Sequence, residues 1–427
     1  MTLTQRTRSS TWALSTPHRS LSSPPKNKRV LAGVALLYVA YIPFDILPVA
    51  YGRTLTGPLA VLLIVTWIIS SLRHHEKISF PRNAGILLFL YCFWMICTIF
   101  WSVDTTAATG SVQPFLLQAP LVVILSNTLG NMWLRSLVTL GCSTSVLGLV
   151  VLTSSADALR EGRANVGGVD ENITAMVLAV GFAALVYAVT HLGRRAALFV
   201  PPAVVTGAAA LHTGSRSGAI AVVGVLVIAL MPLIRQGRRR PVVWFRAAGV
   251  VLLAYFSFTI ARDAGLLPQR VMDLLNQGPA YADSGRASII DAYLRTFGHW
   301  AFFGVGVGND ATYLSATEGA YHNAHSLFWH TWIVTGLVGL TLFASFLTVV
   351  IRRGLRSPAS QALIPLFVPI VVFAITLGGD ETSVFWFVVA LALIPGAPEP
   401  RSSEKARRQA RVLFHSQAGE QRGSVTT

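Results

Sequence analysis

Long apolar segments alternate with short polar segments over most of this chain. A helix needs about 20 mostly apolar residues to cross a membrane. Segments that meet or approach this length are residues 30–50, 54–72, 84–101, 112–128, 133–153, 172–190, 196–212, 217–234, 243–261, 326–350, 361–378 and 381–396. The pattern therefore predicts an all-α, polytopic integral membrane protein with about 12 transmembrane helices.

One connection, residues 262–325, is much longer than the others. Apolar side chains recur in it at a spacing of three to four residues, at Ile289, Ile290, Tyr293, Leu294 and Phe297. This spacing predicts a short amphipathic helix that lies along the membrane surface. The loop then enters the segment at 326 through the motif YHNAHS, without a break.

The two ends of the chain differ from its centre. Residues 1–29 and 397–427 are polar and basic, and we expect them to be disordered tails on either side of a membrane domain at 30–396. The apolar run after Arg29 is longer than the core of a signal peptide, so we interpret it as a retained first helix.

Composition excludes an ordinary soluble fold. The 427 residues are 53% hydrophobic and 12% charged, whereas a soluble protein carries about 25% charged residues. Cys92, Cys97 and Cys142 all lie in apolar segments without the spacing of a metal site, and we interpret them as small buried residues.

The formal net charge of +16 at first suggests a nucleic-acid partner. If the N-terminus is cytoplasmic, however, the Lys and Arg residues gather on the cytoplasmic side, as the positive-inside rule requires. The exceptions on the outer side are Arg53, Arg160, Arg163, Arg216, Arg262, Arg270, Arg286 and Arg295. The charge thus predicts topology and contact with anionic lipids, not binding of nucleic acid. Both tails are then cytoplasmic, and the loop 262–325 is extracytoplasmic.

Three of the outer arginines are candidates for binding an anion. Arg163 lies in the loop LREGRANVGGVDEN, Arg216 lies in the tight turn HTGSRSG, and Arg286 opens the amphipathic helix. A guanidinium group binds a phosphate through two parallel hydrogen bonds, which suits a diphosphate at the outer surface. The alternative is that each arginine reaches the lipid headgroups or pairs with a nearby carboxylate such as Asp170.

Histidines provide the candidate acid–base chemistry. His322 and His325 are three residues apart, so both would face one side of a helix at the membrane boundary, where either can act as a general base. The alternative is that they are polar residues at a helix entrance. A metal site is not favoured, because no carboxylate stands at ligand spacing. His330 lies inside the apolar run, and we expect it to pack against other helices.

Two further features are interpreted as structural. The glycines of FGVGVGN at 303–309 follow no strand, so they predict a tight turn or a close backbone approach and not a nucleotide loop. Asn172 follows two acidic residues and starts an apolar run, which is typical of a helix N-terminus.

Four segments, in this order, resemble the O-antigen ligase and O-antigen polymerase superfamily. They are EGRANVGGVDENITA, TGSRSGAIAV, GRASIIDAYLRTFGHWAFFGVGVGN and AHSLFWHTWIVTGLVGL. The resemblance covers most of residues 84–350 and assigns His325 to the catalytic histidine position. Two departures stand out: Ser326 replaces the usual asparagine, for which Asn323 is a displaced copy, and the proline that usually precedes the glycine-rich turn is absent.

The resemblance implies an activity. Such proteins transfer or polymerise glycans carried on undecaprenyl diphosphate at the outer face of the bacterial cytoplasmic membrane, by an inverting reaction without metal or other cofactor. It implies that Arg163, Arg216 and Arg286 hold the donor diphosphate and that His325 orients or deprotonates the acceptor, a glycan or a lipid. Membrane lipids are the remaining partners.

Two other functions remain open from the sequence. Twelve helices also suit a transporter or a flippase of lipid-linked glycan, in which charged residues would face a central cavity. A non-catalytic scaffold for envelope assembly is the other possibility, and it would tolerate loss of His325.

Overall fold

The computed structural model describes residues 28–47, 54–75, 78–153, 170–237, 286–318, 326–357, 360–378 and 382–395. Every regular element in these ranges is a helix. Eight helices are long and apolar enough to cross a membrane, and shorter apolar helices accompany them. The predicted class, an all-α polytopic membrane protein, is confirmed. The predicted span at 243–261 lies outside the described residues.

The chain order of the helices follows the predicted spans closely. The elements are α1 (Arg29–Tyr41), η3 (Ile42–Ile46), α2 (Thr56–His74), α3 (Arg82–Thr98), η4 (Ile99–Trp101), α4 (Thr105–Thr128), α5 (Trp133–Thr153), α6 (Glu171–His191), η6 (Gly193–Phe199), α7 (Val200–His212), α8 (Arg216–Gly237), α11 (Arg286–Arg295), α12 (Phe297–Trp300), α13 (Asp310–Glu318), α14 (Leu327–Gly354), α15 (Ser360–Thr376) and α16 (Ser383–Ala392).

Three predicted spans differ from the structure at their ends. The first helix ends at Tyr41 and continues as the 3-10 turn η3, because Pro43 has no N–H for the helical ladder. The fourth starts earlier than residue 112, since Asp104 caps α4 by accepting from Thr106 N at 2.9 Å and from Ala107 N at 3.0 Å. The seventh is divided into η6 and α7 at Val200.

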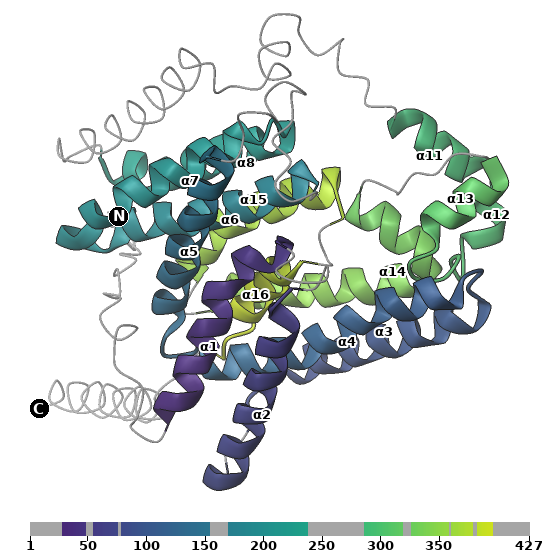
Figure 1. Ribbon diagram of the computed structural model, residues 1–427, viewed down its shortest axis with the longest axis horizontal. Helices are drawn as coiled ribbons and strands as arrows, with labels where there is room; N and C mark the ends of the chain where they lie inside the picture. The colour runs from purple at the N-terminus through teal and green to yellow at the C-terminus, as the bar shows by residue number, and fades with distance from the viewer. Residues whose placement is uncertain are drawn as a thin grey trace, which may run out of the picture.

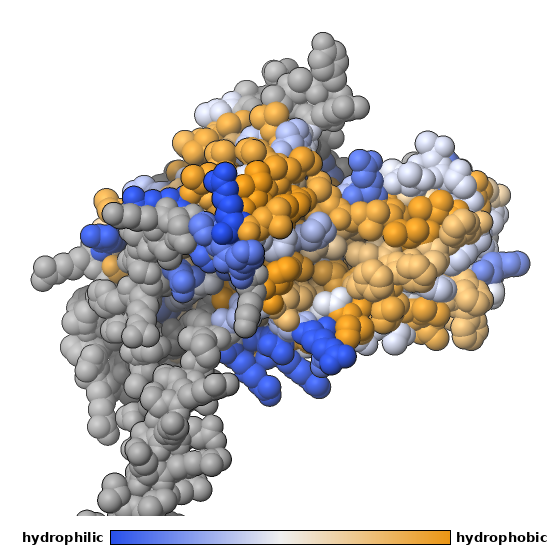
Figure 2. Space-filling model, turned by 90° about the horizontal axis from the view of Figure 1, so that it is seen from below, coloured by the Kyte–Doolittle hydropathy of each residue, from blue (hydrophilic) through white to orange (hydrophobic). Residues whose placement is uncertain are grey.

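Helix α6 lies at the centre of one half of the bundle. It packs against α5, α7, α8 and α15 (Figure 1), and 83% of its most apolar 18-residue stretch is buried inside the protein. A Cβ atom on Gly181 would collide with the side chain of Thr144, so α5 and α6 approach as closely as their backbones allow. Helix pairs in membranes associate through such small residues. Figure 2 shows broad apolar areas on the outside of the helices, as lipid contact requires.

The two ends of the bundle differ in chemistry. We call one end the loop end; it comprises residues 102–104, 170–172, 213–216 and 286–318. Hydrogen bonds join parts of this end that are distant in sequence, such as Asp104 N to Asn309 Oδ1 at 2.8 Å. Basic side chains gather at the opposite end, at Arg73, Arg82, Arg135, Arg195, Arg352, Arg353 and Arg356. The positive-inside rule therefore predicts that the loop end is extracytoplasmic.

Cysteine labelling tests this orientation. In a protein whose three cysteines are replaced by alanine, we expect Ser315→Cys on α13 to react with a membrane-impermeant maleimide applied to intact cells. Ser79→Cys, at the basic end, should react only after the membrane is opened. Both positions are exposed, so burial does not explain a difference. The opposite labelling pattern would show that the orientation is inverted.

Candidate functional site

Helix α14 is broken at Gly336, where φ is 69° and ψ is −174°. The helix has 28 residues, which at 1.5 Å per residue is about 42 Å and exceeds the roughly 30 Å hydrocarbon core of a bilayer. The part after the break, residues 336–354, is about 28 Å long and matches the core by itself. Residues 327–335 therefore belong to the layer at the loop end.

The glycine-rich turn at 304–308 docks on this break. A broken helix leaves carbonyl groups without intrahelical donors, and each would be costly to bury unpaired. Three N–H groups from elsewhere in the chain donate to carbonyl groups before the break: Val305 N to Ile333 O at 2.9 Å, Gly306 N to Val334 O at 3.1 Å, and Trp94 Nε1 to Thr335 O at 2.7 Å. After the break, Leu337 N of α14 donates to Ala301 O at 2.9 Å. The turn thus takes the place of the next turn of helix.

Glycine is required on both sides of this contact. A Cβ on Gly304 would collide with the carbonyl group of Val334, and a Cβ on Gly336 with that of Phe302. Both glycines also have positive φ, 77° and 69°, a conformation that L-residues rarely adopt. The sequence prediction of a tight turn or a close backbone approach is confirmed at Gly304; for Gly336 no such prediction was made.

Asn309 fixes the same turn to the beginning of α4. Its side chain is fully buried. It accepts from Asp104 N at 2.8 Å and donates to the carbonyl groups of Asp104 at 3.2 Å and Val307 at 3.0 Å, as well as to the Ser102 hydroxyl. The loop at 301–309 is therefore held between the start of α4 and the break in α14.

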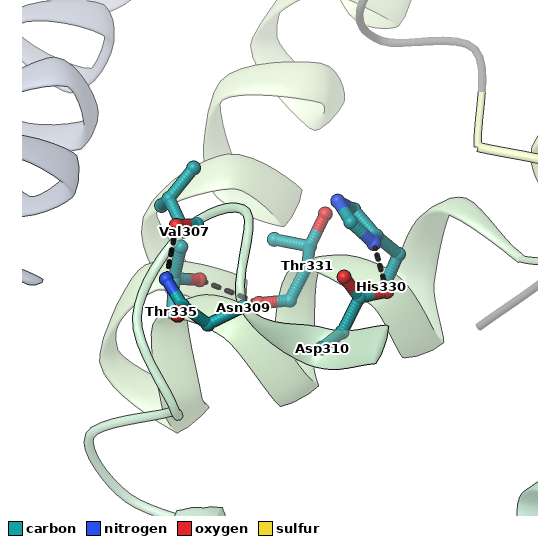
Figure 3. Close-up of polar contacts among 6 residues, drawn as sticks. All are labelled: Val307, Asn309, Asp310, His330, Thr331 and Thr335. Carbon is teal, nitrogen blue, oxygen red and sulfur yellow. Dashed lines mark hydrogen bonds and ion pairs between the residues drawn. The ribbon is translucent and has the colours of Figure 1, made fainter. Parts of the chain in front are cut away.

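A buried carboxylate follows Asn309. Asp310, the first residue of α13, is 4% exposed, and its Oδ2 lies 3.1 Å from Nδ1 of His330 on α14 (Figure 3). Tyr293 on α11 is 1% exposed. Burial, and after it the charge of Asp310, raises the pKa of Tyr293 far above its usual range. Three helices of the loop end thus meet at ionisable groups.

Apolar and aromatic side chains surround this polar group. Trp300, Leu314 and Ile333 pack beside Tyr293 in a cluster separate from the main core. On the outside of the turn, Phe302 and Phe303 are 66% and 61% exposed. Both side chains are apolar and available for contact with lipid.

A second polar contact of the loop end lies at the start of α6. Asp170 caps this helix by accepting from Asn172 N at 2.7 Å. The Asn172 Oδ1 accepts from the hydroxyl of Ser215 at 2.8 Å, and that hydroxyl also accepts from Gly218 N at 3.2 Å to cap α8. Arg216, half-buried, is the first residue of α8. Asn172 thus lies next to the turn that carries Arg216.

The structure brings together only some of the predicted site residues. Asn172 and the turn of Arg216 are in contact, and Arg286 is the first residue of α11, two turns before Tyr293. Arg163, His322, Asn323 and His325 lie outside the described residues. Within the described ranges, no group of three potential metal ligands converges.

Two residues of this region were missed in the sequence. Asn309 and Asp310 directly follow the glycine-rich turn, and both are buried polar residues. A polar pair after a turn is also typical of an ordinary exposed helix start, so the sequence carries no signal that distinguishes the two. His330 was predicted to pack against other helices; it does so, and its contact is a carboxylate.

The fold and this polar face define a multi-pass membrane protein with a structured loop layer on one face. Residues 201–344 match the family model described as O-antigen ligase. This part, about a third of the chain, is similar to the O-antigen ligase family, in agreement with the resemblance found in the motifs. It includes Arg216, Arg286, His325 and the docked turn, but neither Arg163 nor Asn172. No curated protein matches the chain.

The close packing at the break in α14 predicts the effect of a substitution at Gly336 on stability. Gly336→Ala should lower the melting temperature of the purified protein, because a backbone conformation that is essentially limited to glycine costs another residue roughly 1–3 kcal/mol and the new Cβ would collide with the backbone carbonyl of Phe302. Gly110→Ala in α4 is the control, since nothing lies within 4 Å of its Cβ position; we expect it to melt at or above the wild-type temperature. Equal melting temperatures for all three proteins would contradict the packing described here.

Proposed function

We propose that the protein is a membrane glycosyltransferase that transfers or polymerises a glycan carried on undecaprenyl diphosphate, at the extracytoplasmic face of the bacterial cytoplasmic membrane. The single observation that supports it most is the match of residues 201–344 to the O-antigen ligase family. The docked loop layer supports it as well, because its polar groups gather at one end of the bundle, where a lipid-linked sugar would meet water.

The diphosphate of the donor is held by arginine. Arg216 begins α8 at the loop end, and Arg163 and Arg286 complete the proposed set. Each guanidinium group can bind phosphate oxygens through two hydrogen bonds. When the C1–O bond of the donor sugar breaks, its electron pair passes to the diphosphate, and the arginines stabilise that charge. The reaction then needs no metal ion and no nucleotide.

The acceptor is bound on the side of the histidine motif. Its hydroxyl oxygen attacks C1 from the face opposite the diphosphate, which inverts the configuration. The hydroxyl proton passes to a base, and the diphosphate carrier leaves. His325 contacts the acceptor and orients it or takes its proton.

The described residues favour this enzyme over a transporter. A transporter places charged residues at the middle of its spans. Among the residues that the structure describes, the buried carboxylate is Asp310, and it belongs to α13 in the loop layer. This carboxylate therefore lies at the face where a transfer reaction would occur.

The arginine set is tested by a change that keeps charge and removes the guanidinium fork. We expect Arg216→Lys and Arg163→Lys each to lower transfer from the lipid-diphosphate glycan by more than about tenfold, since a charge-assisted hydrogen bond contributes roughly 1.5–3 kcal/mol. Expression should stay near normal. Arg295→Lys is the matched control, because Arg295 is 63% exposed at the same end and pairs with Asp291 at 2.6 Å. Full activity in both variants would show that these arginines do not bind the diphosphate and instead contact lipid headgroups.

The histidine assignment is tested with purified protein and the same substrate. His325→Ala should abolish turnover with little change in the melting temperature, and His322→Ala should lower turnover less, because His322 stands three residues further from α14 in the sequence. A chelator should leave the wild-type rate unchanged. Turnover that survives in His325→Ala but is lost in His322→Ala would show that the roles are reversed, and loss of the wild-type rate on chelation would point to a metal ion.

A further inference from the structure

A group of polar side chains lies inside the bundle, between the end of the first span, α4 and α16. Asp45, in the turn η3 that continues α1, accepts from the Ser383 hydroxyl through Oδ2 at 2.6 Å and from the Thr54 hydroxyl through Oδ1 at 3.1 Å. The Ser383 hydroxyl in turn accepts from Nε2 of Gln118 at 2.9 Å. Helix α16 packs against both η3 and α4, and Figure 1 shows it beside the end of α1. The group thus joins three segments that are distant in the sequence.

The carboxylate of this group belongs to a membrane span. Asp45 lies in the first candidate span, Arg29–Ile46. It forms no ion pair with a Lys or Arg among the residues that the structure describes, where its partners are the two neutral hydroxyl groups. Ionisable side chains in membrane spans are rare, and they usually pair with an opposite charge or mark a site for a substrate or an ion. Because an unpaired charge is costly away from water, a bound cation would stabilise this carboxylate.

The hydroxyl of Tyr38 is an independent indication of a ligand. Tyr38 lies on α1, is 1% exposed, and interacts with Ser383 and Gln118 of the same group. However, within the described part of the chain its hydroxyl makes no hydrogen bond of acceptable distance and angle. Buried hydroxyl groups nearly always have a partner. A ligand bound beside Asp45 would be that partner.

Burial limits the size of such a ligand. Tyr38, Ser383 and Gln118 are 1%, 2% and 7% exposed. A sugar ring or a lipid headgroup is too large to reach groups that are so fully covered by protein, whereas a single ion is small enough.

The chemistry of the group selects the kind of ion. A carboxylate, hydroxyl groups and the carbonyl oxygen of a side-chain amide all provide oxygen ligands, which bind hard cations. One carboxylate balances one positive charge, while sites for divalent ions gather several charged ligands. Among the described residues, no three potential ligands of a divalent or transition metal come together. A monovalent hard cation therefore fits best.

We propose that this polar group is a binding site for an alkali-metal cation such as sodium. The ligands are oxygen atoms of Tyr38, Asp45, Thr54, Gln118 and Ser383. The ion neutralises the carboxylate and joins the end of the first span to the first turn of α16. It takes no part in the proposed transfer of a glycan, so this inference goes beyond the proposed function and does not depend on it.

The test is the melting temperature of the purified full chain in a series of salt mixtures. Sodium chloride replaces N-methylglucamine chloride stepwise at constant ionic strength, and a second series uses potassium chloride. A ligand that binds the folded protein raises its melting temperature until the site is saturated. We expect a saturable rise of about 2–4 °C with at least one of the two alkali ions. The bulky organic cation controls for the general effect of salt.

Two variants locate the effect. Asp45→Asn should abolish the rise, whatever its melting temperature without alkali ions, because the amide is neutral. Tyr38→Phe keeps the ring and removes one ligand, so it should raise the ion concentration at half-maximal effect by about tenfold.

Each variant has a matched control. Tyr41→Phe should respond as the wild type does, since Tyr41 ends the same helix and its buried hydroxyl, which also makes no hydrogen bond within the described residues, is not part of the group. Asp291→Asn should also respond normally, because Asp291 is exposed and pairs with Arg295.

Two results would overturn the proposed site: equal wild-type melting temperatures in all salt mixtures, or an unchanged rise in Asp45→Asn. If Asp45→Asn fails to fold, the half-maximal ion concentration of Tyr38→Phe decides, and a value equal to that of the wild type overturns the site. A wild-type protein that shows the rise but transfers no glycan would support the cation site and overturn only the proposed function.

Discussion

The capped break in α14 is the contact on which the loop layer depends. A helix that stops at the membrane boundary exposes carbonyl groups where water is scarce, and the turn at 304–308 supplies N–H donors to them. Because Asn309 binds the same turn to the start of α4, the break, the turn and two spans form one unit. The short helices α11, α12 and α13 are built on it, at one end of α14 (Figure 1).

This arrangement explains how a membrane enzyme can hold polar chemistry beside lipid. The spans bury apolar side chains and keep their basic residues at the opposite end, while Asp310, His330 and Tyr293 gather within a few turns of the break. Phe302 and Phe303 expose apolar side chains at the same level. Under the proposed function, a donor anchored by its lipid and an acceptor from the aqueous side would meet at this end of the bundle.

Some residues of the site could be predicted from the sequence and others could not. Arg216 and the glycines carry clear signals, because a charge at a tight outer turn and a run of alternate glycines are both rare. Asn172 was interpreted as part of a helix N-terminus, and α6 does begin at Glu171 with Asp170 as its cap. The structure adds the contact of Asn172 with the turn before α8. The sequence around Asp310 does not show that this residue is buried. Its burial results from packing against α11 and α14, which lie elsewhere in the chain.

By itself, the sequence determined the membrane class, the positions of the described spans and the charge difference between their ends, because hydrophobicity and length act locally along the chain. It also indicated that the glycines at 304–308 allow a tight turn or a close backbone approach. Only the tertiary structure decided that Gly304 and Gly336 meet, that α14 is broken at the boundary, and that Asp310 lies 3.1 Å from His330. These contacts join segments that are distant in the sequence. Local sequence patterns do not determine which distant segments pack together.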